Sequence, residues 1–278
     1  MSALLFDLLI FSVSILAGLL GAVVGIGGGA VIVPLLTLVF HIDIRLAIGA
    51  SIISVIATSS GAAVAYIRER MTNLRVGMFL EMGTTVGALT GALLVSVVPD
   101  RALFILFGIV LAWSGISMYK SPADAKPLQS SKDKIANYLK LHSHYEDRAT
   151  GQTVTYAVTG TKLGLGLMYL AGMISALLGI GSGALKVPAM DLAMKIPLKA
   201  SSATSNFMIG VTAAASAGVY FSKGDINPVL TAPVAIGVLV GAIIGSRILG
   251  KLNAKVLRYI FVGVLLVISI EMLQRGLF

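Results

Sequence analysis

The sequence contains no cysteine, and only three of its 278 residues are histidine. Without thiols, the chain can form no disulfide bond, thiolate metal site or cysteine nucleophile. His142 and His144 lie close together in a polar stretch, but no third metal-ligand type accompanies them, so we expect neither a metal site nor a cofactor. Nucleophiles, bases and metal ligands do not cluster along the sequence, which argues against an enzyme.

Charged residues are also scarce. They make up 12% of the chain, against 57% hydrophobic residues, and the mean hydropathy is +0.95. Because this composition lies outside the range of soluble globular domains, we predict an all-α integral membrane protein embedded in a lipid bilayer. The net charge of +9 is spread over short connections between apolar segments, a pattern typical of membrane topology signals and not of nucleic-acid binding.

Ten apolar segments fall into two sets of five, each with the order long, short, long, long, long. A polar stretch separates the two sets. We therefore predict a membrane repeat in residues 1–119, a linker in residues 120–161 and a second membrane repeat in residues 162–278. The first set covers residues 4–24, 30–40, 46–67, 76–98 and 102–118, and the second covers residues 163–178, 184–194, 200–221, 228–248 and 256–273.

The two sets are related in sequence. When the chain is shifted by 154 residues without a gap, residues 17–34 match residues 171–188 at ten of eighteen positions. The same shift brings one stripe of three glycines onto another. Glycines four residues apart let two membrane helices approach closely, so we interpret the stripes as packing faces. The stripes are Gly83, Gly87 and Gly91 in the first set and Gly237, Gly241 and Gly245 in the second.

Loop charge predicts that the two repeats have opposite orientations. The connection at residues 68–75 contains three arginines, whereas its counterpart has only Lys223, offset by Asp225. The next connection has one arginine at residues 100–101, whereas its counterpart at residues 247–258 has four basic residues. Short basic loops stay in the cytoplasm, so equivalent loops should lie on opposite sides of the membrane. We therefore expect inverted-topology repeats, with both termini outside and the linker in the cytoplasm.

Each repeat contains a glycine cluster that ends in proline: GIGGGAVIVP at residues 25–34 and GIGSGALKVP at residues 179–188. Glycine and proline weaken helices, so each cluster should break a membrane helix into a long part and a short part. The short part has about eleven residues, or roughly 16 Å, which is half of a ~30 Å hydrocarbon core. It is therefore either a half-helix that turns back or a tilted helix that crosses fully.

A helix that starts at such a break directs unpaired N–H groups and a positive dipole end toward the membrane midplane. This arrangement suits a small anionic substrate. Tight packing alone is the alternative role for the glycines, and packing is likewise the alternative role for the serines that follow. The expected substrate-binding residues are Gly25, Gly27, Gly28, Gly29, Gly179, Gly181, Ser182, Gly183, Lys186, Ser51, Ser205 and Asn206.

Three of the charged residues within the apolar segments are candidates for a functional role. Lys186 replaces Ile32 of the first cluster, and we expect it to be an anion ligand or a counter-ion because a basic group at that depth is costly. Snorkelling to the interface or pairing with Asp191 are the alternatives. Glu81 and Asp191 are candidates for proton coupling, and an interfacial ion pair near the Arg75 loop is the alternative for Glu81.

The linker is the soluble part of the sequence. Residues 132–142 have the apolar spacing of a short amphipathic helix, and residues 152–158 alternate like a strand. We expect a linker that lies on the membrane surface rather than a catalytic or regulatory domain.

The twin clusters, each followed by a serine-containing helix and joined by a polar middle loop, resemble the TauE/SafE-type sulfite exporter family of small-anion transporters. The resemblance covers nearly the whole chain outside the central loop. It implies a secondary transporter that moves sulfite, an organosulfonate or a related sulfur-containing anion outward across the bacterial cytoplasmic membrane. An anion channel and a non-transport membrane scaffold are the alternatives. The chain departs from a triple glycine at Ser182 and carries Lys186 where the first repeat has isoleucine.

Overall fold

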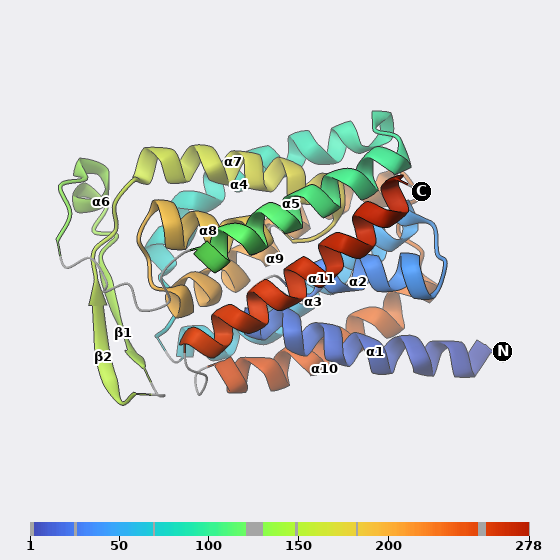
Figure 1. Cartoon of the computed structure of the whole chain (residues 1–278), viewed down its shortest axis with the longest axis horizontal. Coiled ribbons are helices and arrows are strands. Elements are labelled where there is room, and N and C mark those ends of the chain that lie inside the picture. The colour runs from blue at the N-terminus through green and yellow to red at the C-terminus, as the bar shows by residue number, and fades with distance from the viewer. Residues whose placement is uncertain are drawn as a thin grey trace.

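The computed structural model describes residues 3–24, 27–68, 70–120, 130–147, 150–181, 183–249 and 254–277. Long helices make up most of this part of the chain and run roughly along one direction (Figure 1). They are α1 (Ala3–Val24), α3 (Ile44–Arg68), α4 (Leu74–Leu94), α5 (Asp100–Lys120), α7 (Thr161–Leu178), α9 (Leu198–Ser222), α10 (Pro228–Leu249) and α11 (Ala254–Leu277).

Six helices in the described part of the chain are long and apolar enough to cross a membrane. All ten predicted apolar segments are helical, with ends that differ by a few residues from those expected. The sequence therefore predicted the helices of this membrane protein correctly, because backbone N–H and C=O groups in lipid must be satisfied within the segment itself.

Two short helices each form the second part of a glycine cluster and end at its proline. They are α2 (Gly29–Pro34) and α8 (Gly183–Pro188), and each continues into a five-residue π-helix, η1 (Leu35–Val39) or η3 (Ala189–Ala193). A proline has no N–H group, and its ring disturbs the carbonyl four residues earlier. In both segments the wider π-helical turns begin directly after the proline.

The first short helix turns back along α1. Gly27 and Gly28 have φ angles of 85° and 75°, which glycine adopts without the steric cost that a side chain would add. Gly27 N donates a hydrogen bond to Gly21 O at 3.2 Å, which closes the turn. After η1, the Phe40 ring packs edge-on against Phe6, with 5.5 Å between the ring centroids. The short segment therefore ends beside the start of α1, as a half-helix does.

The second short helix turns back in the same way. Gly179 and Gly181 have φ angles of 67° and 75°. Beyond η3, Met194 O accepts a hydrogen bond from Thr159 N at 3.2 Å, just before α7 begins. This short segment also returns to the start of the helix that precedes it. We call the two units, residues 3–40 and 161–194, the first and second hairpins.

The glycine stripes pack closely against the long helices of the hairpins. A side-chain carbon at Gly87 would overlap the carbonyl oxygen of Tyr169, and one at Gly241 would overlap that of Ile15. The stripe of α4 lies on α7, and the stripe of α10 lies on α1. The predicted packing face is thus confirmed. The six contacted carbonyls belong to Leu165, Tyr169 and Met173 for the first stripe and to Phe11, Ile15 and Leu19 for the second.

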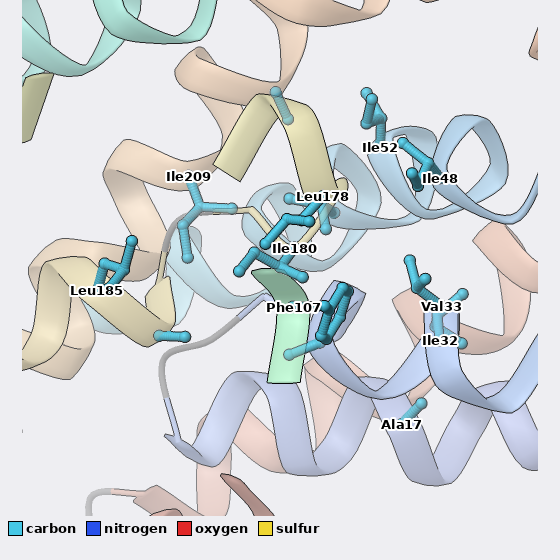
Figure 2. Packing of buried hydrophobic residues seen from close by; sticks show 14 of the residues in the cluster. Ala17, Ile32, Val33, Ile48, Ile52, Phe107, Leu178, Ile180, Leu185 and Ile209 are labelled. Carbon is cyan, nitrogen blue, oxygen red and sulfur yellow. The ribbon is translucent and has the colours of Figure 1, made fainter. Parts of the chain in front are cut away.

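The core lies between the two hairpins and the helices that follow them. Figure 2 shows part of it, where Ile180 from the turn of the second hairpin belongs to one cluster with Phe107, Leu178 and Ile209. All four side chains are completely buried. The turn of the second hairpin is therefore held among buried apolar side chains.

The linker is a small helix and a hairpin of strands at the opposite end from both chain termini (Figure 1). Strand β1 (Ser143–Asp147) pairs antiparallel with β2 (Gln152–Tyr156). The strand predicted at residues 152–158 is confirmed over β2, whereas β1 was not predicted. The expected helix at residues 132–142 is too long, because α6 (Lys134–Tyr138) ends before Lys140, whose φ of 50° turns the chain into β1.

The linker is fixed to the helix ends by polar contacts. Both carboxylate oxygens of Asp133 accept hydrogen bonds from Thr161, at the start of α7. Burial raises the pKa of Asp133, but hydrogen bonds from Thr161, Ala136 and Ile135 outweigh this effect and hold the pKa below its usual value. The Lys199 ammonium of α9 lies 2.6 Å from Asp147 in β1.

Candidate functional site

The two hairpin turns meet in the interior. Ser51 of α3 donates a hydrogen bond from Oγ to Gly179 O at 2.6 Å. A side-chain carbon added at Gly29 would lie 2.6 Å from the same carbonyl oxygen and 2.7 Å from Ser51 Oγ. The first residue of α2 and the turn before α8 are therefore in direct contact, and only glycine permits this approach.

Two further side chains connect the turns. Carbon atoms added at Gly27 and at Gly181 would both contact the side chains of Val55 and Ile209. Val55 lies on α3 and Ile209 on α9, and their positions differ by the same 154 residues that separate Gly27 from Gly181. The two turns thus share one apolar support at the centre of the fold.

A small cavity adjoins the second turn. Its lining includes Gly179, Gly181 and Val55, together with the hydroxyl-bearing residues Thr212 and Ser216 of α9. About 10 Å³ is open to the centre of a water molecule, which is room for about one water. In this conformation the cavity is too small for a sulfur oxyanion.

Lys186 does not line this cavity itself but bonds to Thr212, which does. The Lys186 side chain is 0% exposed, so it does not snorkel to an interface. Nζ donates a hydrogen bond to Thr212 Oγ1 at 2.6 Å and lies 3.3 Å from Glu81 Oε2. Thr212 Oγ1 in turn lies 2.6 Å from Glu81 Oε1. Three helices, α8, α9 and α4, thus bring an ammonium, a hydroxyl and a carboxylate into one buried cluster, the Lys186–Thr212–Glu81 cluster.

Glu81 is held from its own helix as well. Thr85 Oγ1, one turn further along α4, lies 3.2 Å from Glu81 Oε1 and donates to it. The Arg75 guanidinium points elsewhere and donates to Lys140 O at 3.0 Å. The structure therefore places Glu81 in a buried cluster and not in an ion pair with Arg75. Asp191, the other acidic candidate, lies half-buried in η3.

The remaining predicted residues surround the turns. Asn206 Nδ2 donates to Ala22 O at 3.0 Å, near the end of α1, while its Oδ1 has no hydrogen-bond partner among the described residues. Ser205 and Gly183 are buried on α9 and at the start of α8. Gly25 and Ser182 lie outside the described residues. The structure thus brings Gly27, Gly29, Gly179, Gly181 and Ser51 together at the centre, with Lys186 bound to the wall of the adjoining cavity.

Sequence reasoning found Glu81 and Lys186 separately but missed their pairing. It also missed Thr85, although the spacing of four residues places Thr85 and Glu81 on one face of a helix. Within the described ranges, no group of three or more histidine, aspartate or glutamate side chains is arranged to hold a metal ion.

Comparison with known proteins finds relatives along nearly the whole chain. The chain is 28% identical over 271 residues to the "Probable membrane transporter protein YunE" of Bacillus subtilis, covering 95% of this chain and 96% of that protein. It is 27% identical over 285 residues to the "Probable membrane transporter protein MJ0441" of Methanocaldococcus jannaschii, covering 97% and 96% of the two chains.

A plant relative carries the family name. The "Sulfite exporter TauE/SafE family protein 5" of Arabidopsis thaliana is 28% identical over 123 residues, which are 41% of this chain and 26% of that protein. No solved structure matches the chain. Residues 10–272 match the family described as "Sulfite exporter TauE/SafE", so this chain belongs to that family of multi-pass membrane transporters, which are not enzymes.

Proposed function

We propose that the protein is a secondary transporter of a small anion, which binds between the two hairpin turns and reaches each side of the membrane alternately. The observation that carries this proposal is the direct contact between the turns, Gly29 against Gly179, beside a cavity whose wall holds Lys186 through Thr212. A buried ammonium and helix starts at one place favour negative charge. Because the cavity has room for only about one water, the hairpins must move apart to admit the anion.

The proposed architecture is two inverted-topology repeats, in residues 1–119 and 162–278, joined by the linker of residues 120–161. Contacts that differ by 154 residues support it: α10 packs on α1 as α4 packs on α7. Both chain termini lie at one end of the helices and the linker at the other (Figure 1). We infer from loop charge that the termini face outward and the linker faces the cytoplasm.

The proposed substrate is sulfite, an organosulfonate or a related sulfur-containing anion, moved outward across a bacterial cytoplasmic membrane. The family description supports the substrate class. An inside-negative potential favours the exit of net negative charge by about 2.3 kcal/mol per charge per 100 mV.

A binding and transport screen tests the proposal. Thermal unfolding of the purified protein and uptake into proteoliposomes should both respond to one or more of sulfite, sulfate, thiosulfate, sulfoacetate, acetate and phosphate. Lys186→Ala should weaken the response, whereas Lys162→Ala, which removes an exposed lysine of α7, should not. If no anion raises the unfolding temperature and none is taken up into proteoliposomes, transport of these anions is disproved. Currents above transporter turnover, without competition by unlabelled anion from the far side, would indicate a channel.

A further inference from the structure

We propose that the Glu81 carboxylate occupies the place of the substrate on Lys186 in the empty transporter, and that the anion binds together with one proton taken up by Glu81. This inference rests on the proposed function, and it names the coupling ion.

The geometry shows which groups compete. The Lys186 ammonium is completely buried, and the acceptors that the structure gives it are Glu81 Oε2 and Thr212 Oγ1. Thr212 also bonds to Glu81 Oε1 and to Met208 O of its own helix, so its hydroxyl is already shared. An anion that binds the ammonium must therefore replace the carboxylate.

The corresponding pair of positions elsewhere in the chain carries no charges. The position 154 residues before Lys186 is Ile32, and the position 154 residues after Glu81 is Ala235, while Thr212 corresponds to Thr58. The first hairpin thus has the same backbone arrangement without the charges. A buried ion pair is often no more stable than apolar residues of similar volume. A role other than stability therefore explains why the second hairpin carries it.

The proton follows from the balance of charge around Lys186. A carboxylate and a substrate anion on one buried ammonium would leave a net negative charge in a medium of low dielectric constant, which is strongly unfavourable. Protonation of Glu81 removes the excess charge and leaves a neutral acid that can still donate a hydrogen bond.

Among the described side chains, the other charged groups on the surrounding helices are engaged elsewhere, half-buried or exposed, so Lys186 is the charge that the structure places on Glu81. On these elements they are Arg75, which donates to Lys140 O, Lys162, which is exposed, Asp191, which is half-buried in η3, Lys199, which pairs with Asp147, and Lys223, which donates to Ala92 O. On α5, which packs on α8, Asp100 pairs with Arg45 and Arg101 donates to Gly276 O.

The step involves no change in the substrate's covalent bonds. A proton from water binds a carboxylate oxygen of Glu81, and the contact between Glu81 and Lys186 weakens. Lys186 keeps all of its protons and donates to the anion instead. A monovalent anion then moves without net charge, and a divalent anion carries one net negative charge.

Methanesulfonate is a suitable probe, because it remains a monoanion at all pH values used and any pH dependence must come from the protein. We expect wild-type binding, measured by isothermal titration calorimetry in detergent, to strengthen about tenfold for each unit of decrease in pH over the range in which one proton is taken up. Measurements in buffers of different ionisation enthalpy should show uptake of one proton per anion. Binding to Glu81→Gln should be independent of pH, without proton uptake.

Each outcome decides a different point. Wild-type binding without proton uptake would overturn the inference, and so would an unchanged pH dependence in Glu81→Gln. The wild-type measurement needs no variant, so a variant that fails to fold does not remove the test. The double variant Lys186→Ile with Glu81→Ala copies the corresponding uncharged pair, Ile32 and Ala235. It should fold but not bind the anion. Failure of wild type to bind methanesulfonate at any pH would contradict the proposed function for organosulfonates and, with it, this inference.

Discussion

Tyr66 and Tyr220 lie 154 residues apart and make the same contact in the two halves of the protein. Tyr66 Oη donates a hydrogen bond to Ala22 O at 3.0 Å, and Tyr220 Oη donates to Ala176 O at 2.5 Å. Both acceptors belong to the last turn of a long hairpin helix, where carbonyl groups have no partner within the helix. Both side chains are 0% exposed. Each tyrosine therefore fixes the end of a helix where the chain turns back.

Removing either hydroxyl should destabilise the protein to a similar extent. Tyr66→Phe and Tyr220→Phe each leave a buried carbonyl with one hydrogen bond fewer, which costs about 1 kcal/mol. The two hydroxyls donate to different carbonyls, so the losses should add in the double variant. Thermal unfolding in detergent measures the effect, with Tyr138→Phe as the control because Tyr138 is 86% exposed. A large loss for one variant and none for the other would contradict the equivalence of the two turns.

The glycine stripes should tolerate no larger residue. Gly87→Leu would force α4 away from the backbone of α7, because the added side chain meets the Tyr169 carbonyl at once. Overpacking of this kind costs about 3 kcal/mol or more when backbone must move. We expect a clear fall in the unfolding temperature and in the monodisperse fraction on size-exclusion chromatography. Gly241→Leu should have the same effect on the contact of α10 with Ile15.

Gly218→Ala is the matched control for the stripe variants. Gly218 lies inside α9, and a methyl group there meets no heavy atom of the described residues within 4 Å. Alanine favours a helix over glycine by about 1 kcal/mol, so this variant should be as stable as wild type or more stable. A loss of stability equal to that of Gly87→Leu would show that glycine matters here for some reason other than close packing.

The helices could be predicted because their signals are local. Apolar length identified each segment, and the 154-residue shift identified the glycine stripes, as Gly87 and Gly241 illustrate. The sequence did not show β1, whose residues Ser143–Asp147 are mostly polar and are ordered by pairing with β2 and by burial of Tyr145. The sequence also overestimated the length of α6, because the turn at Lys140 depends on the strand that follows.

The candidate site was only partly accessible from sequence. The glycine turns could be identified because glycine next to proline breaks helices in any context. The pairing of Lys186 with Glu81 could not, since the two residues are 105 positions apart and meet only after α4 and α8 have packed around α9. The sequence placed each charged residue within an apolar segment, where burying a charge costs free energy. The partner of each charge depended on tertiary structure.

Asn73 should be important for holding the linker in place. Its Oδ1 accepts a hydrogen bond from Val76 N at the start of α4, and its Nδ2 donates to Leu141 O and Tyr156 Oη of the linker. Asn73→Ala removes the helix cap, worth about 1 kcal/mol, and also both linker contacts. We expect faster tryptic cleavage at Lys134 and Lys140 together with a lower unfolding temperature.

Asn227, 154 residues further on, separates capping from linker attachment. It accepts hydrogen bonds from Val229 N and Leu230 N, and its side chain is exposed. Asn227→Ala should lose about 1 kcal/mol from the cap and leave the rate of linker cleavage unchanged. Equal cleavage rates in the two variants would mean that Asn73 does not anchor the linker.

The orientation of the protein in the membrane can be tested by single cysteines, because the chain has none of its own. Ser222 and Tyr138 are both exposed, one at the end of α9 and the other at the end of α6 in the linker. If the repeats are inverted as proposed, a membrane-impermeant maleimide added to intact cells should label Ser222→Cys and leave Tyr138→Cys unmodified. In inside-out vesicles the pattern should reverse. Labelling of Ser222→Cys from the cytoplasmic side alone would place both connections on one face and exclude the proposed orientation.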